Sequence, residues 1–299
     1  MNRALQIYHD YPRTFWMMIL VNFVDRLGGS LLFPFFALYI TQKFGVGMTQ
    51  VGILFAAFSI SSFIGSFPGG ALTDRFGRKG IIIFSLIATS FSTLLMGFVS
   101  EFQYFLAIAF FSGIFTDVGG PAYEAVFIDI LPQEKRASGF GIRRVAFNLA
   151  IVIGPVIGGF VAARSYMALF IIDAVVSSIV AFLVFMLIPE TKPAAKPGEE
   201  QETTGESFAG YLKVLRDGRF MAFTLVCLLT WMVYMNMNTT LGVYLRDQHG
   251  IPASGYGTLI SINAAMVVLM QFPITRRAEK NPPMLMMALG TLFIAAGLA

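Results

Sequence analysis

Charged residues are scarce in this chain of 299 residues: only 13% are Asp, Glu, Lys or Arg, whereas an ordinary soluble domain has about 25%. This low share excludes a water-soluble domain and a disordered chain. The single cysteine, Cys227, makes an intramolecular disulfide impossible. Only two histidines occur, and the chain has no His/Cys metal spacing, no Walker A loop and no Gly-x-Ser-x-Gly or His-Glu-x-x-His motif. These absences argue against an enzyme and against a bound metal or cofactor.

Apolar sequence, by contrast, is abundant. Hydrophobic residues make up 56% of the chain and the mean hydropathy is +0.72. They gather in stretches of 17 to 27 residues, long enough to cross a hydrocarbon core of about 30 Å as helices. The sequence therefore predicts an all-α, multi-pass membrane protein. The nine expected spans cover about 14–40, 49–73, 80–99, 104–128, 140–163, 167–188, 220–244, 255–275 and 283–299.

The positions of the basic residues predict the orientation of the chain. If the N-terminus is cytoplasmic, 17 Lys and Arg residues lie on inner segments and only three, Lys43, Arg164 and Arg246, lie on outer loops. Because inner loops of membrane proteins carry the excess of Lys and Arg, we expect a cytoplasmic N-terminus and a place in the plasma (cell inner) membrane. The basic pI of 9.2 then reflects topology, and no nucleic-acid partner is expected.

One segment between the sixth and seventh spans is polar. Residues 189–207 are rich in Pro, Gly, Lys, Glu and Thr, which is typical of a solvated linker. Residues 208–219 carry apolar side chains at helical spacing among basic ones, which indicates a short helix on the inner membrane face. We therefore expect three parts: a six-helix N-terminal bundle (1–188), a cytoplasmic linker with an interfacial helix (189–219), and a partial C-terminal bundle of three helices (220–299).

The loop between the second and third spans carries the sequence GGALTDRFGRK, residues 69–79. It resembles motif A of the major facilitator superfamily, G-x-L-x-D-R-x-G-R-K, through Gly70, Asp74, Arg75, Gly77, Arg78 and Lys79. We expect Gly70 to allow close approach of two helices. Asp74 is expected to cap or anchor the N-terminus of the third span, where a negative charge is favourable.

Asp129, at the inner end of the fourth span, stands where this family places a carboxylate that pairs with the motif A arginine. The resemblance implies an Arg78–Asp129 ion pair that latches an inner gate and breaks when that side opens. The alternative is a static staple of the loop, with its basic residues anchored at the anionic inner leaflet.

The fifth span contains a run of small residues and one proline. It resembles motif C of the same superfamily, G-x-x-x-G-P-x-x-G-G, through Gly154, Pro155, Gly158 and Gly159. Ala150 replaces the first glycine. In the family this motif accompanies exporters of the drug/proton antiporter type, whereas the alternative is ordinary small-residue packing between helices. The fourth span departs from the antiporter pattern, because Phe111 stands where motif B has an arginine.

Ionisable residues inside the spans are candidates for function, because a charge within a membrane is costly. The first span contains Asp25 and Arg26, and the fourth contains Asp117 and Glu124. Asp117 and Glu124 are expected to share one helix face, and Arg26 to pair with one of them. A carboxyl that meets Arg26 in only one conformation would bind a proton in the other, as proton coupling requires. The alternative is an ion pair that only cross-links helices. Asp173, an ionisable residue in the sixth span, is expected to have a structural role.

Two asparagines of the seventh span, Asn236 and Asn238, are expected to contact substrate, since this helix lines the cavity in the family. Interhelical hydrogen bonds are the alternative.

The resemblance implies a secondary transporter of the major facilitator type. We expect a monomeric, proton-coupled exporter of hydrophobic or drug-like small molecules that works by alternating access. Two alternatives stay open: a uniporter or proton symporter that imports a sugar or organic acid, and a non-transporting scaffold or sensor with this fold. Twelve spans in two six-helix halves need roughly 400 residues, so we expect a truncated transporter that lacks helices ten to twelve.

Overall fold

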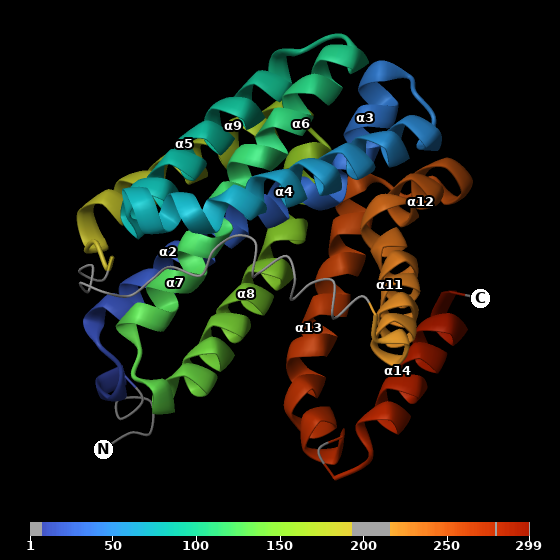
Figure 1. The fold of residues 1–299 in the computed structure, drawn as a ribbon. Coiled ribbons are helices and arrows are strands. Elements are labelled where there is room, and N and C mark those ends of the chain that lie inside the picture. The colour runs from blue at the N-terminus through green and yellow to red at the C-terminus, as the bar shows by residue number, and fades with distance from the viewer. Residues whose placement is uncertain (1–7, 193–215, 279, 299) are drawn as a thin grey trace. The chain divides into compact units, whose positions relative to one another are not determined.

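The computed structural model describes residues 8–192, 216–278 and 280–298, and within these ranges the chain forms helices and no strands (Figure 1). Eight helical segments of this described part are long and apolar enough to cross a membrane. They coincide with the first eight expected spans. The ninth apolar stretch forms α14 (Pro283–Leu298), a shorter helix of 16 residues. The prediction of an all-α, multi-pass membrane fold is therefore confirmed.

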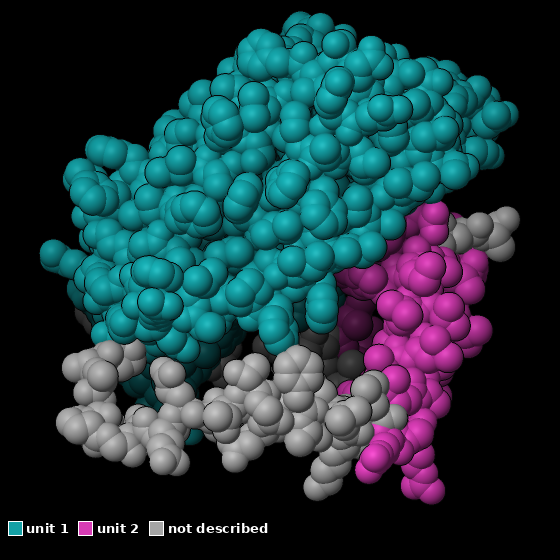
Figure 2. Space-filling model, turned by 45° about the horizontal axis from the view of Figure 1, so that its top comes forward, with its two compact units in different colours: residues 1–192, 238–271 teal, residues 193–237, 272–299 magenta. Residues whose placement is uncertain are grey.

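The helices belong to two compact units, coloured separately in Figure 2: residues 1–192 with 238–271, and residues 193–237 with 272–299. The helices of the first unit are α2 (Arg13–Leu32), η1 (Phe33–Phe35), α3 (Phe36–Phe44), α4 (Met48–Phe76), α5 (Arg78–Phe98), α6 (Phe102–Val118), α7 (Gly120–Ile130), α8 (Gln133–Ala162), α9 (Tyr166–Leu187), α12 (Leu241–His249) and most of α13 (Ala253–Ala278). The second unit holds most of α11 (Gly218–Thr239), the last residues of α13, and α14.

The interfacial helix expected within 208–219 falls almost entirely on residues 193–215, outside the described part of the chain. The division of the chain at residues 188 and 220 stays a prediction.

Three of the expected spans are not single helices. In the first, one turn of 3-10 helix separates α2 from α3 at Pro34, which has no backbone N–H to continue the hydrogen-bond ladder. In the fourth, α6 and α7 are separated at Gly119, two residues before Pro121. In the seventh, α11 ends at Thr239 and α12 begins two residues later, so the predicted end at residue 244 was too late.

Within the first unit, α2 packs on α8 and α9, α4 packs on α6, and α5 packs on both α6 and α9. Figure 1 shows these helices side by side. A core of side chains from α2, α5, α7 and α9 lies towards the start of α2, and its fully buried members include Phe15, Met18, Ile82, Phe127 and Val184. This core holds together the ends of the helices that carry the motif A turn.

The small residues of α8 allow close approach to α2. A Cβ atom on Gly154 would collide with Ser30, and a Cβ atom on Gly158 would lie only 2.8 Å from the ring of Phe35. The Ser30 hydroxyl also donates a hydrogen bond of 3.0 Å to the carbonyl oxygen of Ala150. The run that resembles motif C therefore forms a backbone-to-backbone helix contact of the kind used inside membranes.

The same run also approaches α13. A Cβ atom on Gly159 would lie 2.8 Å from the carbonyl oxygen of Ala253. On the facing helix, a Cβ atom on Gly257 would collide with the carbonyl oxygen of Pro155. The small residues of α8 thus allow both α2 and α13 to pack closely against this helix.

Two alanine substitutions on α8 should have opposite effects on stability. Gly158→Ala places a methyl group against Leu31 and Phe35, and overpacking of this kind costs about 1–3 kcal/mol. Gly141→Ala on the same helix meets no atom within 4 Å and should stabilise by about 0.5–1 kcal/mol, because alanine loses less backbone freedom than glycine. Thermal unfolding in detergent, followed by tryptophan fluorescence, measures both. A melting temperature of Gly158→Ala equal to that of the unsubstituted chain would contradict the tight contact.

Candidate functional site

The turn between α4 and α5 rests on a glycine with unusual backbone geometry. Gly77 has a φ of +93°, which side-chain-bearing residues rarely adopt. Its N–H donates a hydrogen bond of 3.0 Å to the carbonyl oxygen of Thr73. A Cβ atom at this position would also collide with the carboxylate of Glu190. Glycine is therefore needed here both for the turn and for the close approach of Glu190.

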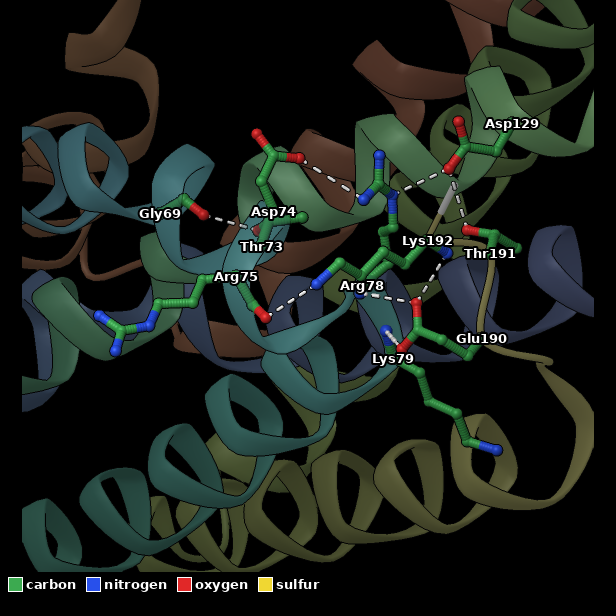
Figure 3. A network of polar contacts seen from close by, with 10 residues as sticks. All are labelled: Gly69, Thr73, Asp74, Arg75, Arg78, Lys79, Asp129, Glu190, Thr191 and Lys192. Carbon is green, nitrogen blue, oxygen red and sulfur yellow. Dashed lines mark hydrogen bonds and ion pairs between the residues drawn. The ribbon is translucent and has the colours of Figure 1, made fainter. Parts of the chain in front are cut away.

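Arg78, the first residue of α5, lies between two carboxylates (Figure 3). Its Nε donates a hydrogen bond of 2.9 Å to Oδ2 of Asp129 on α7, and its Nη1 lies 3.5 Å from Oδ1 of Asp74 on α4. The side chain of Arg78 is only 10% exposed and that of Asp129 is 21% exposed, whereas that of Asp74 is 58% exposed. The pair with Asp129 is therefore the less screened of the two and the stronger one.

The N-terminus of α5 is capped by a residue that lies far away in the sequence. Glu190, just after the end of α9, accepts hydrogen bonds from the backbone N–H groups of Arg78 at 2.9 Å and Lys79 at 3.2 Å. These N–H groups have no partner inside the helix, and a carboxylate beside them also meets the positive end of the helix dipole. Asp74 was expected to cap or anchor this helix. Glu190 takes the capping position, whereas Asp74 contacts the side chain of Arg78, the first residue of α5.

The next two residues extend the contact. The Thr191 hydroxyl donates a hydrogen bond of 3.0 Å to Oδ2 of Asp129, and Nζ of Lys192 donates one of 2.9 Å to the carbonyl oxygen of Arg75. We refer to Glu190, Thr191 and Lys192 as the 190–192 clasp. Figure 3 shows the clasp between the α4–α5 turn and the end of α7.

The remaining motif A residues have smaller parts in this network. Gly70 was expected to allow close approach of two helices. This expectation was wrong, because a Cβ atom on Gly70 would meet nothing within 4 Å. Its neighbour Gly69 makes the close approach instead: a Cβ atom at that residue would lie 2.7 Å from the carbonyl oxygen of Val118 on α6. Arg75 lies over the ring of Phe76 at 5.4 Å, and Nζ of Lys79 lies 5.2 Å from the ring centre of Phe185.

Removal of the clasp carboxylate should lower stability. Glu190→Ala leaves two N–H groups of α5 without their acceptor, and loss of a helix cap costs about 0.5–2 kcal/mol. The control is Glu134→Ala, an exposed acidic residue in the first turn of α8. Tryptophan fluorescence during thermal unfolding should show a lower melting temperature for Glu190→Ala than for Glu134→Ala. Equal melting temperatures would show that the cap contributes nothing.

A second group of polar residues lines a cavity of about 380 Å³ between α2, α7 and α8. The lining residues are Asn22, Asp25, Arg26, Gly120, Tyr123, Glu124, Phe140, Arg143, Arg144 and Phe147. The structure thus gathers three of the four predicted proton-coupling residues around one space. Arg143 and Arg144, which belong to the 17 basic residues expected on inner segments, also line this cavity.

The ion pair inside this cavity differs from the expected one. Glu124 lies 2.6 Å from Nη2 of Arg143, whose guanidinium also lies over the rings of Phe127 at 4.8 Å and Phe140 at 4.9 Å. Arg26 lies over the ring of Phe147 at 5.4 Å, and within the described residues it forms no ion pair with Glu124. The expected partner of Arg26 on α7 is therefore held by α8.

Asp117 lies away from the cavity lining. It accepts a hydrogen bond from the hydroxyl of Ser62 on α4, whereas Glu124 contacts α8. The expectation that the two acids share a helix face was wrong, because the helix is interrupted at Gly119 between them. The Asp117–Arg26 pair, the other expected arrangement, does not form in the described part of the chain.

The other candidate residues lie elsewhere. Asp173 on α9 is 7% exposed and lies near the side chain of Thr93 on α5. Asn236 on α11 donates from its amide to the backbone carbonyl oxygens of Met232 at 3.1 Å and Val233 at 3.3 Å, within its own helix. Asn238 lies two residues further along the same helix.

At the far end of α12, Arg246 connects this short helix to α3. Its Nη1 donates a hydrogen bond of 3.0 Å to the Thr41 hydroxyl. Its Nε donates one of 2.7 Å to the neighbouring Asp247. The hydrogen bond and charge of Arg246 hold the pKa of Asp247 below its usual value.

A bundle of apolar helices around a charged cavity is the architecture of a membrane transporter. The family model described as Major Facilitator Superfamily matches residues 18–299. The chain belongs to the Major Facilitator Superfamily, and the predicted family is confirmed. Since the members it resembles are transporters, the prediction that the chain is not an enzyme is also confirmed.

Individual relatives support this placement. The chain is 25% identical over 301 residues to a Na⁺, Li⁺, K⁺/H⁺ antiporter of Planococcus maritimus, covering 91% of this chain and 70% of the relative. It is 25% identical over 263 residues to multidrug resistance protein 2 of Bacillus subtilis (strain 168), covering 87% and 65%. A bacterial homologue of the human lysosomal transporter Spinster, in an inward-facing and unoccupied conformation, matches with a TM-score of 0.73 at 18% identity, covering 95% of this chain and 64% of that one. The chain thus spans about two thirds of their length.

Proposed function

We propose that this chain works in a proton-coupled exporter of hydrophobic or drug-like small molecules that operates by alternating access. The observation that carries the proposal is the charged cavity, which gathers Asp25, Arg26 and Glu124 in a chain of a transporter family. The names of two relatives support it, since one is an antiporter of cations against protons and the other a multidrug resistance protein.

The cavity supplies the groups that proton coupling needs. Glu124 is held by Arg143, and Asp25 lies beside Arg26 in the sequence and on the same cavity wall. A movement of α7 relative to α8 that separated Glu124 from Arg143 would leave a carboxylate without its cation. We propose that a carboxylate freed in this way exchanges a proton during the transport cycle. Asp117, with its hydroxyl partner on α4, is the third candidate for this role.

We propose the Arg78–Asp129 pair as the latch of the inner gate. The pair joins the start of α5 to the end of α7, and both side chains are largely shielded from solvent. Opening of this side requires that the pair separate.

The setting of the protein is also proposed. The charge distribution supports a plasma (cell inner) membrane location with a cytoplasmic N-terminus, and the transporter is proposed to act as a monomer. Asn236 and Asn238 are proposed to contact substrate from α11, where part of the Asn236 amide already bonds to its own helix.

Transport in proteoliposomes tests the coupling. With an imposed pH gradient, the chain should move a fluorescent hydrophobic dye, and dye addition should move protons that a trapped pH indicator detects. Neutralisation of all three acids (Asp25→Asn, Asp117→Asn and Glu124→Gln) should abolish the proton movement. The control is Glu101→Gln, an exposed acid just before α6 with no side-chain cap contact.

Each result has a distinct meaning. Dye transport that persists unchanged in the triple variant contradicts proton coupling through these acids. Transport that proceeds without a pH gradient favours a uniporter. No transport of any solute by a full-length version favours a scaffold or sensor.

Amide hydrogen exchange tests the latch. Asp129→Asn keeps the shape of the side chain but removes its charge, and loss of a partly buried ion pair of this kind costs about 1–2 kcal/mol. Exchange at the N-terminal amides of α5 should therefore become about tenfold faster, since local opening limits it. Asp10→Asn, an exposed acid before α2, is the control. An unchanged rate in Asp129→Asn would show that the pair does not restrain this end.

A further inference from the structure

The α9 helix contains a single charged residue, Asp173, which is buried. It lies seven residues after Tyr166, the start of α9, or about 10 Å along the helix. The other end, at Leu187, is about 21 Å away, so Asp173 lies well inside the span. A carboxyl at this depth is a candidate for function, and no Lys or Arg of the described residues forms an ion pair with it.

The carboxylate of Asp173 lies against the backbone of α2. A Cβ atom on Gly28 would be 3.5 Å from Oδ1 of Asp173 and would collide with Val176, at 2.8 Å. Glycine at this position therefore allows α9 to bring its carboxylate to the surface of α2. Asp25 lies three residues before Gly28, about 60° away around the helix, so the two share one face. Asp25 and Asp173 are close enough to interact electrostatically.

The basic residues of α2 and α5, two of the helices that pack on α9, lie away from Asp173. On α2, Arg26 is about 160° around the helix from Gly28 and lies over an aromatic ring of α8. On α5, the side chain near Asp173 is that of Thr93. The basic residues of α5, Arg78 and Lys79, are its first two, about 21 Å or more from Thr93 along the helix.

The third neighbour, α8, has no basic residue at the level of Asp173. Its last basic residue, Arg144, is 18 residues before its end at Ala162, or about 27 Å. Asp173 is only about 10 Å from the start of α9, and three residues join the two helices. Arg164, in this loop, is exposed. Within the described helices, the charged group that faces Asp173 is therefore Asp25, which has the same sign of charge.

Asp25 connects the buried acid to the cavity between α2, α7 and α8, which it lines together with Arg26, Arg143 and Arg144. Tyr123 of α7 also interacts with it electrostatically. Two neighbouring carboxylates in a medium of low dielectric, with no cation between them, are costly to ionise together. A proton shared by the two acids removes this cost.

We propose that Asp173 is a proton-carrying residue of the transport cycle and that it shares one proton with Asp25. The proton enters from solvent in the cavity at Asp25 and passes to Asp173, which leaves Asp25 ionised. Because Gly28 follows Asp25 along α2, this transfer moves the proton away from the motif A end. The inference rests on the proposed proton coupling and deepens it, since it names a second carboxyl group and the direction of transfer.

Infrared difference spectroscopy of the full 299-residue chain in lipid nanodiscs tests this inference, because a protonated carboxyl group has a C=O stretching band that a carboxylate lacks. The relevant band is the one absent from the double variant Asp25→Asn/Asp173→Asn. In the unsubstituted chain it should disappear as the pH rises. In each single variant the repulsion between the two acids is gone, so the midpoint should fall by about one pH unit or more.

The control variant is Ser177→Ala, which removes a buried hydroxyl one turn after Asp173 on the same helix. It should leave the midpoint unchanged. Asp173→Glu keeps the acid and should keep a titrating band, which preserves the test if Asp173→Asn fails to fold. A band that persists at every pH, an unchanged midpoint in Asp25→Asn, or an equal shift in Ser177→Ala would each overturn the inference.

Transport separates this inference from the proposed function. In proteoliposomes, Asp173→Asn should abolish the proton movement that dye addition causes. If that movement persists in Asp173→Asn but is lost in Asp25→Asn, the role of Asp173 is wrong and the proposed function stands. If the two acids titrate as a coupled pair but a full-length version transports nothing, the pair stands and the transport function is wrong.

Discussion

The side chain of Arg78 is the contact on which the α4–α5 end of the first unit depends. Its guanidinium meets Asp129 on α7 and Asp74 on α4, while its backbone N–H is held by Glu190 beyond the end of α9. One residue thereby joins three helices, α4, α5 and α7, to the segment that follows α9. Inside a membrane the hydrophobic effect does not drive helices together, so such polar contacts and close packing carry the association. Gly77 makes the arrangement possible, because its positive φ turns the chain and leaves room for Glu190.

The charges that line the cavity between α2, α7 and α8 are arranged differently from those around Arg78. Around Arg78 the carboxylates of Asp129, Asp74 and Glu190 each contact that residue, and the clasp completes the arrangement. In the cavity, Glu124 and Arg143 form such a pair, but Arg144 and the buried Tyr123 hydroxyl do not.

Much of the fold could be predicted from sequence, because membrane spans are set by length and apolar composition alone. The motif A residues were also placed on the correct turn. The rotation of a helix about its own axis was harder to predict. Gly69 and Gly70 are about 100° apart on α4, and the sequence of a helix that is apolar all round does not indicate which of the two glycines faces α6. The shared face of Asp117 and Glu124 failed because Gly119 interrupts the helix. The role of Glu190 as the cap of α5 could not be predicted from residue spacing, since its partners are more than a hundred residues away in the sequence.

Two of the hydrogen bonds at the α4–α5 end share a single acceptor atom, Oδ2 of Asp129. Oδ2 of Asp129 accepts hydrogen bonds from both Nε of Arg78, at 2.9 Å, and the hydroxyl of Thr191, at 3.0 Å. Because the two donors share one acceptor, a displacement of Asp129 weakens both bonds together. A displacement of Asp129 alone therefore frees both Arg78 Nε and the Thr191 hydroxyl, whereas the Glu190 cap on α5 does not involve Asp129.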